Sequence, residues 1–300
     1  MRVRHNVTPL VEMLAERHGP QRAREILSVW AGLKSARLRV APVELTSLTQ
    51  IVEALGLAWR RSGRKYLRKR DVGKGGWSNK FNGSVSRDSP RGDWLLYVAR
   101  DGATADAARA AEEQNRESDF AGHLSIPACC AKFHLKFLDA AYAKQNDYVP
   151  FVLDQTAGAP PYNFLLNYVT RYFGYALISF FPCSFQCRAA ANVAQRTLDL
   201  LERHAPRLAA ETVRLQKCSV LYTEYRGLYL FEKGVWDWHI SALRYDPKAI
   251  RGTLPLDSAV FRKLRTGRML EVESKHAAVI RRGGKALAAL RGENVSICIF

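Results

Sequence analysis

The stretch Val220-Leu-Tyr-Thr-Glu-Tyr-Arg-Gly-Leu-Tyr-Leu-Phe-Glu232 predicts two short antiparallel strands joined by a turn at Gly227. Both runs are rich in β-branched and aromatic residues, and a glycine between two such runs is typical of a β-hairpin. A second turn at Gly234 leads into a further predicted strand from Trp236 to Tyr245. These strands decide the fold class, because the segments before them are mainly helical in pattern.

Apolar residues at helical spacing predict most of the earlier elements. The predicted helices cover Thr8 to Arg17, Gln21 to Leu33, about 45 to 55, Pro127 to about 144, and Pro182 to His204. Trp94 to Ala99 is a predicted buried strand. Since helices and strands do not alternate regularly, we expect an α+β fold, with helical N-terminal and central parts packed on a mixed or antiparallel sheet.

Changes in composition divide the chain into four predicted parts. Residues 1–58 form an N-terminal helical region, residues 59–92 a basic glycine-rich segment, residues 93–217 a core that carries cysteine motifs, and residues 218–300 antiparallel strands packed on that core.

The composition indicates a globular protein of the cytoplasm. The chain has 300 residues, of which 47% are apolar, enough for a sizeable core. It contains no run of about eighteen apolar residues, and its N-terminus lacks the apolar stretch of a secretory signal, so we expect no membrane association. Cytoplasmic thiols are normally reduced, which favours ligands, catalysts or core residues over disulfides for the six cysteines.

Four cysteines fall into two copies of one short pattern, Leu124-Ser-Ile-Pro-Ala-Cys-Cys130 and Ile178-Ser-Phe-Phe-Pro-Cys-Ser-Phe-Gln-Cys187. Proline is favoured at the first position of a helix, so both cysteine pairs are predicted in opening turns, where the helix dipole favours a thiolate. Brought together, the two turns would form a sulfur-rich metal or redox site. Cys218 and Cys298 stand alone in apolar segments and are predicted to be core residues.

Two ligand sets follow from this spacing, because residues four apart share a face of a helix. Cys130, His134, Cys183 and Cys187 would make a Cys3His set suited to zinc. Cys129 in place of His134 gives an all-sulfur set suited to an iron–sulfur cluster. Adjacent cysteines point about 100° apart on a helix, which favours the cluster and makes Cys129 the candidate for weakest ligand or free catalytic thiol. Inert core thiols, or a catalytic pair or reversible disulfide, are the open alternatives.

The cysteine segments resemble the uncharacterised prokaryotic family called DUF483. Members typically show Tyr-Pro-x-Cys-Cys followed by Pro-Cys-Ser-x-x-Cys, and the resemblance covers roughly residues 93 to 205, including Asn163-Phe-Leu-Leu-Asn167. The first motif departs from the family, with Ser125 where glycine is usual and Ile126 where tyrosine is usual. The resemblance implies that the four cysteines belong together, and it implies no reaction.

Four further polar residues are candidates for a site near the cysteines. His123 precedes the first motif and could donate a proton, or it could be a loop residue without a role. Asp154 lies beside a glycine-proline loop, where it could reach a cleft as a catalytic group or cap a turn. Asn163 and Asn167 could line a cofactor pocket or cap a short helix.

The charge predicts an anionic partner. Lysine and arginine number 46 against 28 acidic residues, a formal net charge of +18. Seven candidate anion-binding residues are concentrated in one short segment: Arg60, Arg61, Arg64, Lys65, Arg68, Lys69 and Arg70. Aromatic residues lie nearby, and residues 60–74 could therefore bind nucleic acid, or form a solvated loop.

The sequence therefore predicts a cysteine-ligated metalloprotein, with an iron–sulfur cluster favoured and zinc as the alternative cofactor. We expect an enzyme that acts on an anionic small molecule, with redox chemistry as one option. A binding module for nucleic acid or a phosphorylated carrier, with structural cysteines, is the competing hypothesis.

Overall fold

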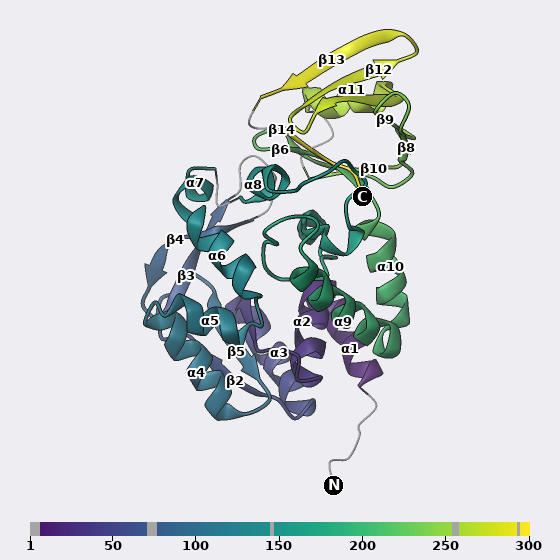
Figure 1. The fold of residues 1–300 in the computed structure, drawn as a ribbon. Coiled ribbons are helices and arrows are strands. Elements are labelled where there is room, and N and C mark those ends of the chain that lie inside the picture. Colours follow the sequence, from purple (N-terminus) through teal and green to yellow (C-terminus); the bar gives the residue numbers. More distant parts are fainter. Residues whose placement is uncertain (1–6, 71–76, 145–146, 254–257, 293–294) are drawn as a thin grey trace.

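Every strand pair in the described part of the chain is antiparallel, so the predicted α+β class is confirmed. Figure 1 shows the computed structural model, which describes residues 7–70, 77–144, 147–253, 258–292 and 295–300. The strands are β1 (Ala36–Val40), β2 (Ala58–Arg61), β3 (Lys65–Arg70), β4 (Trp77–Val85), β5 (Trp94–Ala99), β6 (Ser219–Thr223), β7 (Gly227–Phe231), β8 (Val235–Asp237), β9 (Ala242–Arg244), β10 (Ile250–Gly252), β11 (Met269–Ser274), β12 (Ala277–Arg282), β13 (Lys285–Arg291) and β14 (Val295–Cys298). They form sheets in the orders β1-β5-β2, β10-β7-β6-β14 and β13-β12-β11-β9-β8, with β3-β4 as a separate hairpin.

All of the described helices except α11 lie before β6 in the chain (Figure 1). The α-helices are α1 (Thr8–His18), α2 (Pro20–Trp30), α3 (Pro42–Ala54), α4 (Gly102–Glu113), α5 (Glu117–His123), α6 (Ala128–Lys136), α7 (Leu138–Ala143), α8 (Val149–Asp154), α9 (Arg188–His204), α10 (Pro206–Gln216) and α11 (Ala259–Thr266). Two 3₁₀ segments, η1 (Phe164–Leu166) and η2 (Tyr168–Phe173), precede the second cysteine motif.

The sheet β10-β7-β6-β14 is buried on both faces and lies between two hydrophobic cores. Side chains alternate along a strand, so Val220 and Tyr222 of β6 join the main core, which the helices α1, α2, α3, α6 and α9 also build. Leu221, between them, joins the C-terminal core, where Phe261 of α11 packs together with apolar residues of β11 and β12. One sheet therefore connects the part that carries the cysteines to the C-terminal strands.

The sheet β1-β5-β2 is also packed against hydrophobic residues on both faces. Leu96 and Val98 of β5 face the main core beside α2 and α3, whereas Leu95 and Tyr97 pack with Ala108 of α4 on the opposite face. This burial on both faces explains why the apolar run of β5 was predictable as a strand. The strand β1 was not predicted.

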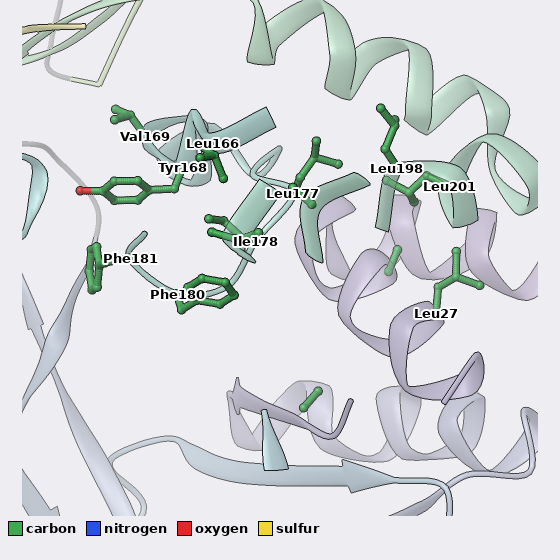
Figure 2. Close-up of a cluster of buried hydrophobic side chains, with 14 of the residues drawn as sticks. Leu27, Leu166, Tyr168, Val169, Leu177, Ile178, Phe180, Phe181, Leu198 and Leu201 are labelled. Carbon is green, nitrogen blue, oxygen red and sulfur yellow. The ribbon is translucent and has the colours of Figure 1, made fainter. Parts of the chain in front are cut away.

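The main core includes the residues that lead into the second cysteine motif. Figure 2 shows part of it. The labelled side chains come from α2 (Leu27), from η1 and η2 (Leu166, Tyr168 and Val169), from the segment before Cys183 (Leu177, Ile178, Phe180 and Phe181) and from α9 (Leu198 and Leu201). All of these side chains are at most 9% exposed. Packing therefore fixes residues 177–181, although they form no helix or strand.

Four predicted elements differ from the structure. The segment from Gly174 to Phe181, whose apolar run predicts a strand, forms no strand. The predicted helix from Pro127 is divided at Phe137, where α6 ends and α7 begins. The predicted strand Trp236 to Tyr245 is a hairpin of β8 and β9, because the chain turns between Asp237 and Ala242. The predicted helix from Pro182 begins only at Arg188, and this difference changes how the cysteines are presented.

Candidate metal centre

Four sulfur atoms from two distant segments form one cluster. The Sγ atoms of Cys129, Cys130, Cys183 and Cys187 all lie within 4.8 Å of one another. The separation is 3.9 Å between Cys129 and Cys130, 3.7 Å between Cys129 and Cys187, and 3.8 Å between Cys130 and Cys187. The grouping of these four residues was predicted, and the cluster is suited to hold a metal ion or a metal cluster.

The first pair lies in the opening turn of α6, as expected. Pro127 is the N-cap, so Cys129 and Cys130 are the second and third residues of the helix. Their exposures differ because they lie on different faces: Cys130 is 1% exposed within the main core, whereas Cys129 is exposed. Cys130 therefore lies on the side of the sulfur cluster that faces the main core, and Cys129 lies on the side that faces solvent.

The second pair is presented by a loop, and the prediction that Cys183 and Cys187 share a helical face is wrong. Residues 183–186 form turns, and Cys187 is the N-cap of α9. Tertiary contacts occupy the backbone groups that a helix would use at Phe185: its N–H donates to Thr156 Oγ1 at 2.9 Å, and its carbonyl accepts from the Asn163 N–H. With its ring fully buried, Phe185 anchors the loop.

Three of the thiols, Cys130, Cys183 and Cys187, differ in acidity. Burial raises the pKa of Cys130 strongly and that of Cys183 to about 12, and the neighbouring sulfurs add to the rise. Burial also opposes ionisation of Cys187, but the Ala190 N–H and the neighbouring thiols outweigh it and lower the pKa of that group. A sulfur at the start of a helix is expected to behave in this way. The protein thus favours a thiolate at Cys187, and a cation would be needed to ionise Cys130 and Cys183.

The two histidine candidates are placed apart from the sulfur cluster. The His134 ring stacks on Tyr148, with 4.7 Å between ring centroids, and lies parallel to Phe181 at 6.2 Å. Among the described residues, the group of closely spaced ligand atoms contains the four cysteines and not His134. His123 ends α5, and its backbone carbonyl accepts from the Ser35 N–H.

Asp154 has a partner that the sequence did not suggest. Its Oδ1 lies 2.7 Å from Nε2 of His276, whose Nδ1 lies 2.6 Å from the Val295 carbonyl. Both ring nitrogens of His276 therefore face oxygen acceptors within the protein. Lys275 donates to the carbonyls of Leu153 and Thr156 at the end of α8. These contacts tie the turn between β11 and β12 to α8, a pairing that no local motif indicates.

The two asparagines have structural partners. Asn163 Oδ1 accepts from the Leu165 N–H, the capping role that the sequence left open. Asn167 is fully buried, and its Nδ2 donates to the carbonyls of Gln216 and Cys218. No local sequence signal points to Thr156. Its hydroxyl links α8 to the cysteine loop, because it accepts from the Phe185 N–H and donates to the Val152 carbonyl. Cys218 and Cys298 are buried, as predicted.

Several cations of the basic segment have partners within the protein. Arg60 pairs with Asp106 at 2.9 Å, Arg68 pairs with Asp93, and Lys65 donates to the Ser89 carbonyl. Four members have no ion pair among the described residues: Arg61, Arg64, Lys69 and Arg70. Residues 71–74 of the predicted binding segment lie outside the described residues.

Comparison with known proteins leaves the resemblance untested. No family model matches the chain, no curated protein shows significant similarity to it, and no solved structure matches it. The DUF483 resemblance therefore stays a prediction from the two cysteine motifs. None of the described helices combines the length and apolar character needed to cross a bilayer.

Proposed function

We propose that Cys129, Cys130, Cys183 and Cys187 hold a single zinc ion, and that this ion joins the start of α6 to the loop before α9. The sulfur separations carry the proposal. In a tetrahedral site with zinc–sulfur bonds of about 2.3 Å, neighbouring sulfurs are about 3.8 Å apart. Three pairs here are separated by 3.7, 3.8 and 3.9 Å, and the others lie within 4.8 Å.

The same distances favour zinc over the iron–sulfur cluster expected from the sequence. In a four-iron cluster each thiolate binds its own iron, and the irons are separated by sulfide, so the cysteine sulfurs must be farther apart than around one ion. The helical argument for a cluster also weakens, because a loop presents Cys183 and Cys187 and can adjust to Cys129 and Cys130.

The proposed role of the ion is structural. Four thiolates complete a tetrahedral zinc shell and leave no position for substrate or water. Cys129, the expected weakest ligand, lies as close to Cys187 as Cys130 does, which supports four equivalent ligands. The bound ion would close the chain between residues 130 and 183 and so restrict the unfolded state as well as fix the loop. The expected reaction on an anionic small molecule stays a prediction.

Metal analysis of anaerobically purified protein tests the proposal. We expect one zinc per chain, and substitution by cobalt should give the absorption bands of tetrahedral cobalt thiolate. Cys183→Ala and Cys129→Ala should both lose the metal. Cys298→Ala is the matched control, because Cys298 is buried in the same core without belonging to the sulfur cluster. Iron with labile sulfide, or full zinc content in Cys129→Ala, would contradict a closed zinc site.

A further inference from the structure

The helix α11 has one apolar face and one basic face. Val260, Phe261 and Leu264 are buried in the C-terminal core. Arg262, Lys263 and Arg265 are exposed on the other side of the helix. At 100° per residue these three lie within one arc of the helix surface. The exposed face therefore presents three cations and no large apolar side chain.

Arg268 extends this basic face beyond the end of the helix. Its side chain is exposed, while its backbone N–H donates to Arg281 and its carbonyl accepts from Tyr245. Its position is therefore fixed by the sheet that α11 covers. We call Arg262, Lys263, Arg265 and Arg268 the α11 cluster.

No carboxylate in the described part of the protein neutralises the α11 cluster, in contrast to other arginines of the same region. On the sheet face turned away from α11, Arg244 pairs with Asp237, Arg281 with Glu271, and Arg291 with Glu273. Four like charges within seven residues repel one another, and unscreened positive potential of this kind attracts polyanions.

We propose that the α11 cluster binds the phosphate backbone of a nucleic-acid duplex. Three of its four members are arginines, whose planar guanidinium groups match the oxygens of a phosphodiester. A membrane surface fits less well, because the apolar face of α11 is already buried and the basic face of this helix presents no large apolar side chain that could enter a bilayer. The segment 60–70 fits less well, because Arg60, Lys65 and Arg68 are engaged within the protein.

Contacts of this kind predict affinity without base specificity and with strong salt dependence. Three to four neutralised phosphates correspond to a log–log salt slope of about −3. Binding of mixed-sequence duplexes should thus weaken by roughly two orders of magnitude between about 50 and about 200 mM salt. The inference does not involve the cysteines, so it can fail or hold independently of the zinc proposal.

The test compares three triple variants of the full chain that lose the same charge. Arg262→Gln with Lys263→Gln and Arg265→Gln removes the three members of the α11 cluster that lie on the helix. Arg244→Gln with Arg281→Gln and Arg291→Gln removes paired arginines from the opposite sheet face. Arg61→Gln with Arg64→Gln and Arg70→Gln removes exposed cations of the basic segment. Fluorescence anisotropy with about 30-base-pair RNA and DNA duplexes over the salt range gives affinity and slope for each.

We expect the α11 triple to lose about a hundredfold in affinity at low salt and most of the salt slope, while the other triples change affinity by about threefold or less. Equal losses in all three would mean that only net charge matters, and the proposal would be wrong. A larger loss in the 61-64-70 triple would move the site to the basic segment and also overturn it. So would binding to phosphatidylserine vesicles without binding to either duplex. Melting temperatures identify any misfolded variant. If the α11 triple is misfolded, Lys263→Gln alone should still show a smaller loss of affinity for the duplexes.

Discussion

At the scale of single residues, His134 shows how burial fixes a charge state. Burial lowers its pKa below the ordinary value near 6.5, against a smaller opposing effect of Glu117. The unfolded chain then takes up a proton more readily than the folded protein. This contribution to stability is present above pH 6.5 and is lost as pH falls below that value.

The variant His134→Phe should therefore lose part of this acid sensitivity. A phenyl ring can keep the stacking with Tyr148 and Phe181 but cannot take up a proton. We expect the difference in unfolding free energy between pH 7 and about pH 5.5 to be smaller in the variant, with unchanged zinc content. Denaturant titrations at the two pH values measure it. Loss of zinc would instead show that His134 is a ligand.

Zinc binding should depend steeply on pH, because the thiols of Cys130 and Cys183 have raised pKa values and must release their protons to the solvent. Release of at least two protons means that affinity falls by roughly a hundredfold or more for each unit by which the pH is lowered. Competition titrations with a chromophoric chelator at several pH values give this slope. A slope near tenfold would mean that only one thiol is protonated in the metal-free protein.

At the scale of elements, the junction of α8 with the cysteine loop depends on one hydroxyl group. Thr156→Val leaves the buried Phe185 N–H without an acceptor, which should cost about 1–3 kcal/mol and weaken zinc binding. The matched control is Thr212→Val, because Thr212 is equally buried and its hydroxyl donates to the carbonyl four residues earlier at 2.7 Å, as that of Thr156 does. The control should lose stability without losing zinc affinity. Equal zinc affinity in the two variants would contradict the role given to Thr156.

The elements also show where prediction from sequence ends. The β6–β7 hairpin and the start of α6 follow from local signals, a glycine turn and an N-terminal proline, and both were predicted. The loop at Cys183 copies the same proline signal but is held open by Thr156 and Asn163, which lie more than twenty positions earlier in the chain. The Asp154–His276 contact joins still more distant residues. The sequence thus predicted which four cysteines come together but not the geometry of the loop that presents Cys183 and Cys187.

At the scale of the whole molecule, the two cores should respond differently to loss of metal. Cys130 and Cys187 belong to the main core, whereas β11 and β12 pack on the C-terminal core. We expect chelation to speed amide hydrogen exchange in α6 and the first turns of α9 by at least about tenfold, with little change in β11 to β13. Mass spectrometry of exchanged peptides measures both. Uniform loss of protection would mean that the metal stabilises the molecule as a single cooperative unit.

The shared sheet also restricts how this chain can tolerate insertions and deletions. Val220 and Tyr222 belong to the main core and Leu221 to the C-terminal core. Successive residues of β6 therefore alternate between the two cores. Removing one residue from β6 would exchange these memberships along the strand and place a tyrosine where a leucine fits. Because both faces of β6 are apolar, the shortened strand would still be apolar throughout, although each side chain would point into the wrong core. We therefore expect length changes in this strand to be far more damaging than single apolar replacements, and to disturb both halves of the molecule at once.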